Sequence, residues 1–411
     1  MHLIQPFAGL RPAADRAPEI VAPPYDVLSS DEARARAAGK PWSFLHISKP
    51  EIDLPPGTDV YSAPVYAKAA ENLQRMIDAG VLVRDDAPCY YVYRIVMGTH
   101  TQTGLVAAAS VADYDKNRIR RHELTRPDKE DDRVRQIEAL NAQTGPVLLA
   151  YPRAPSVDAI LQATTSTVPV ADATADDGVR HTVWAIRDAA TIEKLTAAFD
   201  AMHALYIADG HHRSAAASRV CAARKAANVG HTGNESYNNF LSVIFPDHEL
   251  AIFDYNRVVT DLNGLDLPAF IERIGAAFTV EISPAQIKPS KHGEVGMYVK
   301  NQWYRLTINP ALVPQDPVAR LDVSLLSDHL LAPILGIADL RRDKRIDFVG
   351  GIRGLPELEK RVNSGEMAVA FAMYPTTMAD LMSVADADQI MPPKSTWFEP
   401  KLADGLLSHV L

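Results

Sequence analysis

The sequence has few of the residues that mark a secreted or membrane-bound protein. Only two of its 411 residues are cysteines, Cys89 and Cys221, and their spacing is not that of metal ligands. We therefore expect a reduced, cytoplasmic protein. No stretch approaches about 18 consecutive apolar residues, so no membrane span is expected. The first residues, MHLIQPFAGLRP, lack the charged and apolar regions of a signal peptide.

A surplus of basic residues is also missing. The chain has 42 Lys and Arg against 51 Asp and Glu, a net charge of −9. Sequence-independent binding of nucleic acid requires a basic face, so nucleic acid is not an expected partner. The chain shows neither internal repeats nor a low-complexity tail. Its 411 residues, 47% of them apolar, are enough for two or three domains with cores of their own.

The densest chemical motif is the stretch YIADGHHRSAAA at residues 206–217. An apolar run, Leu205–Ile207, predicts a buried strand before it, and the Ala-rich residues 214–227 predict a helix after it. The first turn of a helix offers unpaired N–H groups and a positive dipole end, and Arg213 adds a planar fork. We therefore expect an anion site here. Asp209 would lie beside it as a candidate base or metal ligand.

The same motif also has a purely structural explanation. Asp-Gly is a common turn pair, and Asp209 could cap the helix. His211 and His212 are adjacent, so on a helix they point in different directions and are not expected to bind one metal ion together.

A second charged stretch covers residues 116–135, KNRIRRHELTRPDKEDDRVR. Beyond Pro127 its charges have the spacing of a solvated helix held by i,i+4 pairs. The part before Pro127 favours an extended loop. Such a loop, carrying His122, Glu123, Thr125 and Arg126 into a helix start, could position charged ligands or could simply be solvated.

Two other segments contain prolines beside polar groups. Pro23-Pro24 stiffens the backbone before Tyr25 and Asp26, which favours a packed tyrosine but could present Asp26 to a site. In MPPKSTWFEPK, residues 391–401, either the aromatics pack the segment or Lys394 and Lys401 close over an anion.

Hydrophobic patterns predict several further elements. Residues 64–79 have helical spacing up to Gly80. Residues 90–97 and 104–111 predict a hairpin, residues 43–47 a strand, and 301–302 a hairpin turn. Residues 322–335 predict an apolar helix that ends at Gly336.

Five motifs in this order resemble one known family. They are APPYDV at Ala22–Val27, RHELTRPDKEDDR at Arg121–Arg133, ADGHHRSAA at Ala208–Ala216, LDVSLL at Leu321–Leu326 and MPPKSTWFEPK at Met391–Lys401. Their spacing is similar to that of the bacterial and archaeal family catalogued as domain of unknown function 1015. The DGHHR segment is also similar to the signature of the ParB/sulfiredoxin-like superfamily, which includes free serine kinases.

The resemblance implies an α+β fold with a ParB/sulfiredoxin-like nucleotide-binding core. Residues 1–250 would form this core with the DGHHR motif, and residues 251–411 a second α+β lobe whose tail returns toward the cleft. The implied function is nucleotide-dependent phosphoryl transfer to or from a small hydroxy-amino acid such as serine, with ATP or ADP and Mg²⁺. Phosphoserine dephosphorylation is the same reaction in reverse. A nucleotide-binding regulator of the ParB type is the alternative, and a homodimer is left open.

The resemblance also assigns roles to residues: Asp209 would act at the substrate hydroxyl, and His211, His212 and Arg213 would contact phosphate. From the charged groups of the chain we add Glu123 and His122 as candidate catalytic residues, with Asp209 or Glu123 as a Mg²⁺ ligand. We also add Gly210, Lys129, Arg133 and Lys394 as candidate phosphate or nucleotide ligands. Further candidates are Tyr25, Asp26, Thr125 and Asp132. Many relatives carry His-Arg where this chain has Asn256-Arg257, so any chemistry of that histidine would be lost here.

Overall fold

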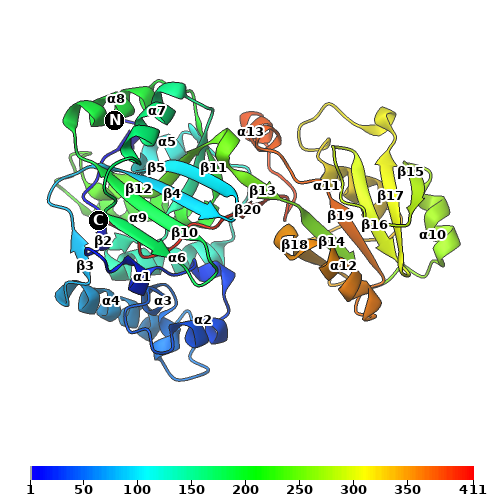
Figure 1. Cartoon of the computed structure of the whole chain (residues 1–411), viewed down its shortest axis with the longest axis horizontal. Helices are drawn as coiled ribbons and strands as arrows, with labels where there is room; N and C mark the ends of the chain where they lie inside the picture. Colours follow the sequence, from blue (N-terminus) through cyan, green and yellow to red (C-terminus); the bar gives the residue numbers. More distant parts are fainter. Residues whose placement is uncertain (1) are drawn as a thin grey trace. The chain divides into compact units, whose positions relative to one another are not determined.

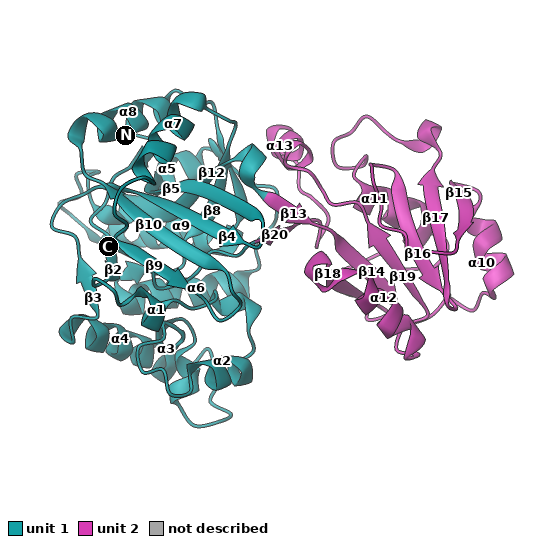
Figure 2. Cartoon of the chain, viewed as in Figure 1, with its two compact units in different colours: residues 1–250, 400–411 teal, residues 251–399 magenta. Residues whose placement is uncertain are grey.

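The computed structural model describes residues 2–411, which form two compact units (Figures 1 and 2). Unit 1 contains the described residues up to 250 together with 400–411, and unit 2 contains residues 251–399. The sequence-based division placed residues 400–411 with the second lobe, whereas they cluster with unit 1. The architecture is a mixed α/β fold with several sheets. Within residues 2–411 no helix combines the length and apolar character needed to cross a membrane.

Unit 1 is built around a nine-stranded sheet. Its strand order is β6-β11-β8-β12-β5-β4-β10-β9, with β1 paired to β5. The strands of unit 1 are β1 Ile4–Gln5, β2 Leu10–Pro12, β3 Leu82–Arg84, β4 Tyr90–Met97, β5 His100–Ser110, β6 Ile119–Arg120, β7 Ala142–Gln143, β8 Val147–Tyr151, β9 Ala171–Thr174, β10 Arg180–Ile186, β11 Leu205–Asp209, β12 Asn239–Pro246 and β21 His409–Val410. Its helices are α1 Ala17–Ile20, α2 Ser30–Ala37, α3 Leu45–Ser48, α4 Ala63–Asp78, α5 Val111–Asp115, α6 Pro127–Leu140, α7 Pro155–Thr164, α8 Ala189–Asp200 and α9 His211–Ala227.

The middle of this sheet is covered on both faces. All residues of β8 and β12 are buried, and the two strands run parallel to each other. Uninterrupted apolar runs such as VLLAY are typical of strands that pack on both sides. One core joins the sheet to α5, α7, α8 and α9, through residues such as Tyr114, Leu161, Phe199 and Cys221. A second apolar cluster lies among α1 to α4.

Most of the predicted elements of unit 1 are present. The helix of residues 64–79 is α4, and Gly80 follows it at φ 66°. The predicted hairpin is β4 and β5, paired antiparallel around Gly98. The strand expected at residues 43–47 is wrong, because this segment forms α3, Leu45–Ser48. Phe44, Leu45 and Ile47 are buried in the helical cluster. A short apolar run has no period that distinguishes a strand from a buried helical turn.

Unit 2 has a six-stranded antiparallel sheet, in the order β15-β17-β16-β19-β14-β18, and a separate pair, β13 and β20. Its strands are β13 Ala251–Phe253, β14 Tyr255–Val259, β15 Phe278–Ser283, β16 Glu294–Val299, β17 Gln302–Ile308, β18 Ile346–Gly350, β19 Val369–Met373 and β20 Trp397–Glu399. Its helices are α10 Leu267–Ile274, α11 Asp322–Leu326, α12 Gly354–Asn363 and α13 Met378–Asp386.

Two predictions in unit 2 need adjustment. The turn between β16 and β17 is Lys300-Asn301, both at positive φ, one residue earlier than expected. The apolar helix expected over residues 322–335 is α-helical only to Leu326 and continues as a π-helical turn, Ser327–Leu331. Gly336, at φ 70°, follows this segment.

Candidate functional site

The DGHHR motif forms the junction between β11 and α9. β11 ends at Asp209, and α9 begins at His211. Gly210 between them has φ 99°, and a Cβ on this residue would lie 3.3 Å from the Cα of Val147. A glycine is therefore required both by the left-handed backbone and by the close approach of β8. Among the residues that the structure describes, no side chain caps the N-terminus of this 17-residue helix. The start of such a helix offers N–H groups and a positive dipole end to an anion.

The segment Arg121–Arg126 lies against the start of α9. The amide of His122 donates to Nε2 of His211 at 3.5 Å, and the amide of Arg126 donates to Nε2 of His212 at 3.0 Å. The two adjacent histidines thus point to different parts of the same loop. At the far end of this loop, Thr125 donates to Glu130 in the first turn of α6.

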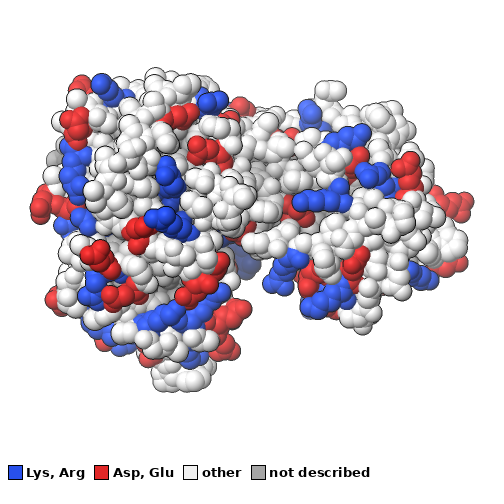
Figure 3. All heavy atoms as spheres, in the orientation of Figure 1, with Lys and Arg blue, Asp and Glu red and all other residues white. Residues whose placement is uncertain are grey.

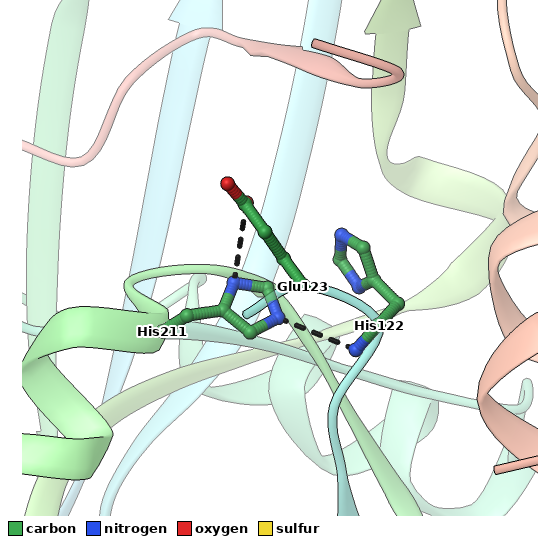
Figure 4. Close-up of side chains that lie close together, drawn as sticks. All are labelled: His122, Glu123 and His211. Carbon is green, nitrogen blue, oxygen red and sulfur yellow. Dashed lines mark hydrogen bonds and ion pairs between the residues drawn. The ribbon is translucent and has the colours of Figure 1, made fainter. Parts of the chain in front are cut away.

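His122, Glu123 and His211 form the core of this contact (Figure 4). Nδ1 of His211 lies 3.8 Å from Oε2 of Glu123, and the rings of His122 and His211 meet edge to face at 4.5 Å. Burial lowers the pKa of His122 to about 4 and holds that of His211 well below its ordinary value. Both imidazoles are therefore neutral near pH 7. Burial also lowers the pKa of His212.

Asp209 is held by two cations. Its Oδ2 accepts a hydrogen bond from Nζ of Lys401 at 3.3 Å and lies 4.0 Å from the guanidinium of Arg213. Burial favours the neutral acid, but Lys401 and Arg213 outweigh it, so the pKa of Asp209 lies below its usual range. A carboxylate with so low a pKa is a weak general base and a permanent negative charge.

Arg213 reaches from α9 toward the loop before β8. It donates to the carbonyl of Pro146 and lies 3.9 Å from Oδ2 of Asp26. Its side chain is 11% exposed. Burial alone would lower the pKa of Arg213, but the nearby carboxylates, Asp209 foremost, outweigh burial and raise this pKa above its usual value. Arg213 is thus a fixed, buried charge at the start of α9.

Arg133 of α6 and Arg213 of α9 both line one small cavity. It donates twice to Asp132, at 2.6 and 3.0 Å, and its guanidinium stacks 3.8 Å from the ring centre of Tyr25. Asp132 also accepts from Tyr66 at 2.8 Å. The shared cavity, of about 30 Å³, is lined by residues that include Tyr25, Arg133, Thr144, Gly145, Arg213 and Asp404. This volume suits a water molecule or two.

Two of the proposed ligands make their contacts elsewhere. Lys129 donates to the hydroxyl of Tyr61 at 2.8 Å and lies over its ring. Lys394 belongs to unit 2, where its Nζ lies 5.5 Å from the ring centre of Tyr255 and its carbonyl accepts from Arg257. Within that unit Asn256 is fully buried, donates to Asp254 and accepts from the amide of Met373. Its amide side chain is thus fixed by structural hydrogen bonds.

Two residues of the segment 400–411 complete the charge cluster. Lys401 stands out in the sequence only as a candidate anion ligand, yet it pairs with Asp209. Asp404 carries no sequence signal beyond an Asp-Gly turn. It is 3% exposed, and its backbone pairs with Ala22. Burial raises the pKa of Asp404 to about 7, opposed by Arg213 and Arg133 and aided by Asp26.

Figure 3 shows Lys and Arg interspersed with Asp and Glu on the face that it draws. The fold and site therefore define a mixed α/β protein with a buried cluster of paired charges at a helix start. The chain belongs to the family described as "Protein of unknown function (DUF1015)", whose model matches residues 4–324.

Comparison with curated proteins finds no match. The chain has a distant likeness to several solved structures. A conserved hypothetical protein from Pyrococcus furiosus shares 14% identity at a TM-score of 0.35, covering 74% of this chain and 94% of that one. A free serine kinase in complex with AMP shares 12% sequence identity at a TM-score of 0.35, covering 73% of this chain and 92% of the kinase. C-terminally truncated SbnI from Staphylococcus aureus shares 10% identity at a TM-score of 0.36, covering 73% of this chain and 85% of SbnI.

Proposed function

We propose that unit 1 has a ParB/sulfiredoxin-like core that binds a nucleotide through its phosphates at the start of α9. In this proposal it transfers a phosphoryl group between the nucleotide and a small hydroxy-amino acid of the serine class. The observation that carries the proposal is the uncapped N-terminus of α9 with the buried guanidinium of Arg213 beside it. Unpaired N–H groups and a fixed cation at one point are what a phosphate needs. The DGHHR motif resembles that of the free serine kinases.

The balance of charge favours a cation that arrives with the nucleotide. Three cations, Arg133, Arg213 and Lys401, meet four carboxyl groups, those of Asp26, Asp132, Asp209 and Asp404. A polyphosphate would add several negative charges to a cluster that has no surplus of positive charge. Mg²⁺ is usually held by phosphate oxygens and one or two carboxylates. The ionised Asp209, one third exposed, suits this role better than Glu123, which lies beside two imidazoles. Bound Mg²⁺ would neutralise charge on the phosphoryl group.

In this reaction the chain mainly positions and neutralises its substrates. Phosphoryl transfer passes through a loose transition state that requires little help from a base. Arg213 and the helix start would hold the phosphates. Asp209, fixed by Lys401, would orient the attacking hydroxyl through a hydrogen bond. ATP or ADP would be the donor, and the same site run in reverse would dephosphorylate phosphoserine.

One observation favours the alternative of a nucleotide-binding regulator without a small substrate. The cavity that Arg213, Arg133 and Asp404 line is about 30 Å³, which is too small for an amino acid. A regulator would bind nucleotide at the same helix start and show no turnover with serine.

Calorimetry with ATP, ADP and AMP, followed by phosphorus NMR with L-serine and phosphoserine, tests the proposal. Arg213→Ala should weaken nucleotide binding by about 10- to 100-fold, since a charge-assisted hydrogen bond contributes roughly 1.5–3 kcal/mol. Arg224→Ala, in the last turn of the same helix, is the matched control and should bind as the wild type does. Unchanged affinity in Arg213→Ala would exclude this phosphate site.

Asp209→Asn separates the catalyst from the regulator. Asparagine keeps the size and the turn preference but removes the charge. In a catalyst, turnover should fall by about tenfold or more, because the charged hydrogen bond to the hydroxyl and the Mg²⁺ ligand are lost. Nucleotide affinity should change far less, or increase because a carboxylate near phosphate is lost. Tight nucleotide binding by the wild type without any transfer would instead establish the regulator.

A further inference from the structure

His122, Glu123 and His211 bring two imidazoles and one carboxylate to one point of unit 1. Ligand atoms of all three lie within 4.8 Å of one another. His122 and His211 are 2% and 4% exposed, whereas the side chain of Glu123 is half exposed. The three residues come from the loop before α6 and from the first turn of α9, two elements that the fold packs together.

One atom of this cluster lacks the partner that its burial demands. Nδ1 of His122 is fully buried and makes no hydrogen bond within residues 2–411. A buried polar group without a partner is destabilising, so such groups are rare and normally meet a ligand, an ion or water. The ring of His122 stands edge to face with that of His211, the second imidazole of the cluster.

The distance between His211 and Glu123 also fits an ion. Nδ1 and Oε2 are 3.8 Å apart, too far for a hydrogen bond. In a tetrahedral site with ligand distances of about 2.0–2.2 Å, two ligand atoms lie roughly 3.3–3.6 Å apart. The 3.8 Å separation is close to this value, and a rotation of the half-exposed Glu123 side chain would bring its carboxylate into range. The ligand atoms of all three residues lie within 4.8 Å of one another, so binding of an ion would draw them closer together.

We infer that His122, Glu123 and His211 form a binding site for a divalent transition-metal ion of the Zn²⁺ class. Imidazole nitrogens suit Zn²⁺, Fe²⁺ and Co²⁺, whereas Mg²⁺ prefers oxygen ligands in an octahedral shell. Three protein ligands leave open positions for water or an anion, as in catalytic rather than structural zinc sites. This inference stands on the three side chains alone. Its one link to the proposed function is that an open coordination position could bind a phosphate oxygen.

Metal binding must also account for one proton. In the neutral imidazole of His211, Nε2 accepts from the amide of His122, so Nδ1 carries the hydrogen. When Nδ1 binds the ion, this proton moves to Nε2, and the 3.5 Å contact from the amide is given up. Two N–H groups would then face each other, so the His211 ring must shift away from the amide when the ion binds, and this shift lowers the affinity of the site.

The test is a titration of the whole chain without nucleotide, after removal of bound metal with a chelator. We expect one equivalent of Zn²⁺ to bind, and Co²⁺ to give the visible absorption of a site with nitrogen and oxygen ligands. Glu123→Gln should weaken Zn²⁺ binding by about tenfold or more, because the charged ligand is lost. His122→Asn should do the same. Mg²⁺ in large excess should not displace Zn²⁺.

A second His–carboxylate pair in unit 1 provides the matched control. His231 lies 2.9 Å from Glu235 but has no second imidazole in its cluster. Glu235→Gln should therefore leave the binding of the first equivalent unchanged. The half-exposed Glu123 can be changed without disturbing the core, so Glu123→Gln stays informative even if His122→Asn does not fold. Unchanged Zn²⁺ affinity in Glu123→Gln, or displacement by equimolar Mg²⁺, would overturn the site, whatever the nucleotide experiments show.

Discussion

Nζ of Lys401 lies 3.3 Å from Oδ2 of Asp209, although 192 residues separate them in the sequence. The pair ties the segment 400–411 to the end of β11, at the point where the DGHHR motif begins. Asp209 is therefore not a free carboxylate with a strong tendency to accept a proton. It is an ionised group with a fixed direction, and Lys401 is part of the site as much as the motif itself.

The first prediction concerns this pair. Lys401→Met should lower the free energy of unfolding by on the order of 1 kcal/mol near pH 7, since both side chains are partly exposed and screened. The folded-state pKa of Asp209 is lowered, so the pair stabilises the protein above the unfolded pKa of about 3.9 and loses its effect as pH falls below it. The difference between variant and wild type should stay constant from pH 8 to 5.

Denaturant unfolding at several pH values measures this difference. Lys401→Arg, which keeps the charge, should restore most of the stability. A deficit in Lys401→Met that persists unchanged well below pH 3.9 would show that packing of the lysine stem, not its charge, is responsible.

The second prediction concerns Gly210 and uses Gly178 for comparison. Both glycines have positive φ, 99° and 82°, but a Cβ on Gly178 meets nothing within 4 Å, whereas one on Gly210 meets Val147 and Arg213 at 3.3 Å. Gly178→Ala should therefore cost only the strain of the left-handed backbone, about 1 kcal/mol. Gly210→Ala should cost at least about 1 kcal/mol more, because β8 and α9 must move apart.

Urea unfolding of the two variants gives the comparison directly. Nucleotide affinity should fall in Gly210→Ala alone, because only this change moves the start of α9. Equal losses of stability in both variants would mean that the approach of Val147 is not tight enough to matter.

Local sequence patterns were sufficient for much of the fold and for part of the site. The strand, glycine and helix around Asp209 were predicted because each has a strong local signal: an apolar run, a turn residue and an Ala-rich segment. The loop before Pro127 was predicted because proline restricts the residue before it. The helix at Leu45–Ser48 was missed because its apolar residues pack in a cluster formed by distant helices. No local period records that packing.

The long-range parts of the site could not be predicted from any local pattern. The pairing of Lys401 with Asp209, and of Asp404 with Ala22, depends on the path of the last twelve residues through unit 1. Lys129 shows the reverse case. It lies in the same charged stretch as Arg133, four residues earlier in the sequence, yet its side chain donates to Tyr61. Sequence spacing determines which residues can converge, and packing determines which of them do.

The last prediction concerns Asp404, the buried carboxyl that sequence patterns missed. Its folded-state pKa is raised to about 7 by burial, against an unfolded value of about 3.9. Between these values the folded state binds more protons than the unfolded state, so its contribution to stability falls as pH rises and is fully lost above about pH 7. Asp404→Asn removes this dependence. Relative to wild type, the free energy of unfolding of the variant should rise by roughly 2–3 kcal/mol between pH 5 and pH 8, at 1.36 kcal/mol for each pKa unit.

Asp176→Asn, at an exposed site beside Lys40, controls for the general effect of charge. Its free energy of unfolding should depend on pH as that of the wild type does. Unfolding free energies measured at pH 5, 6, 7 and 8 decide the matter. If the unfolding free energy of Asp404→Asn also has the pH dependence of the wild type, then Arg213 and Arg133 already keep Asp404 ionised at pH 5. The cluster then carries one more negative charge than its burial implies.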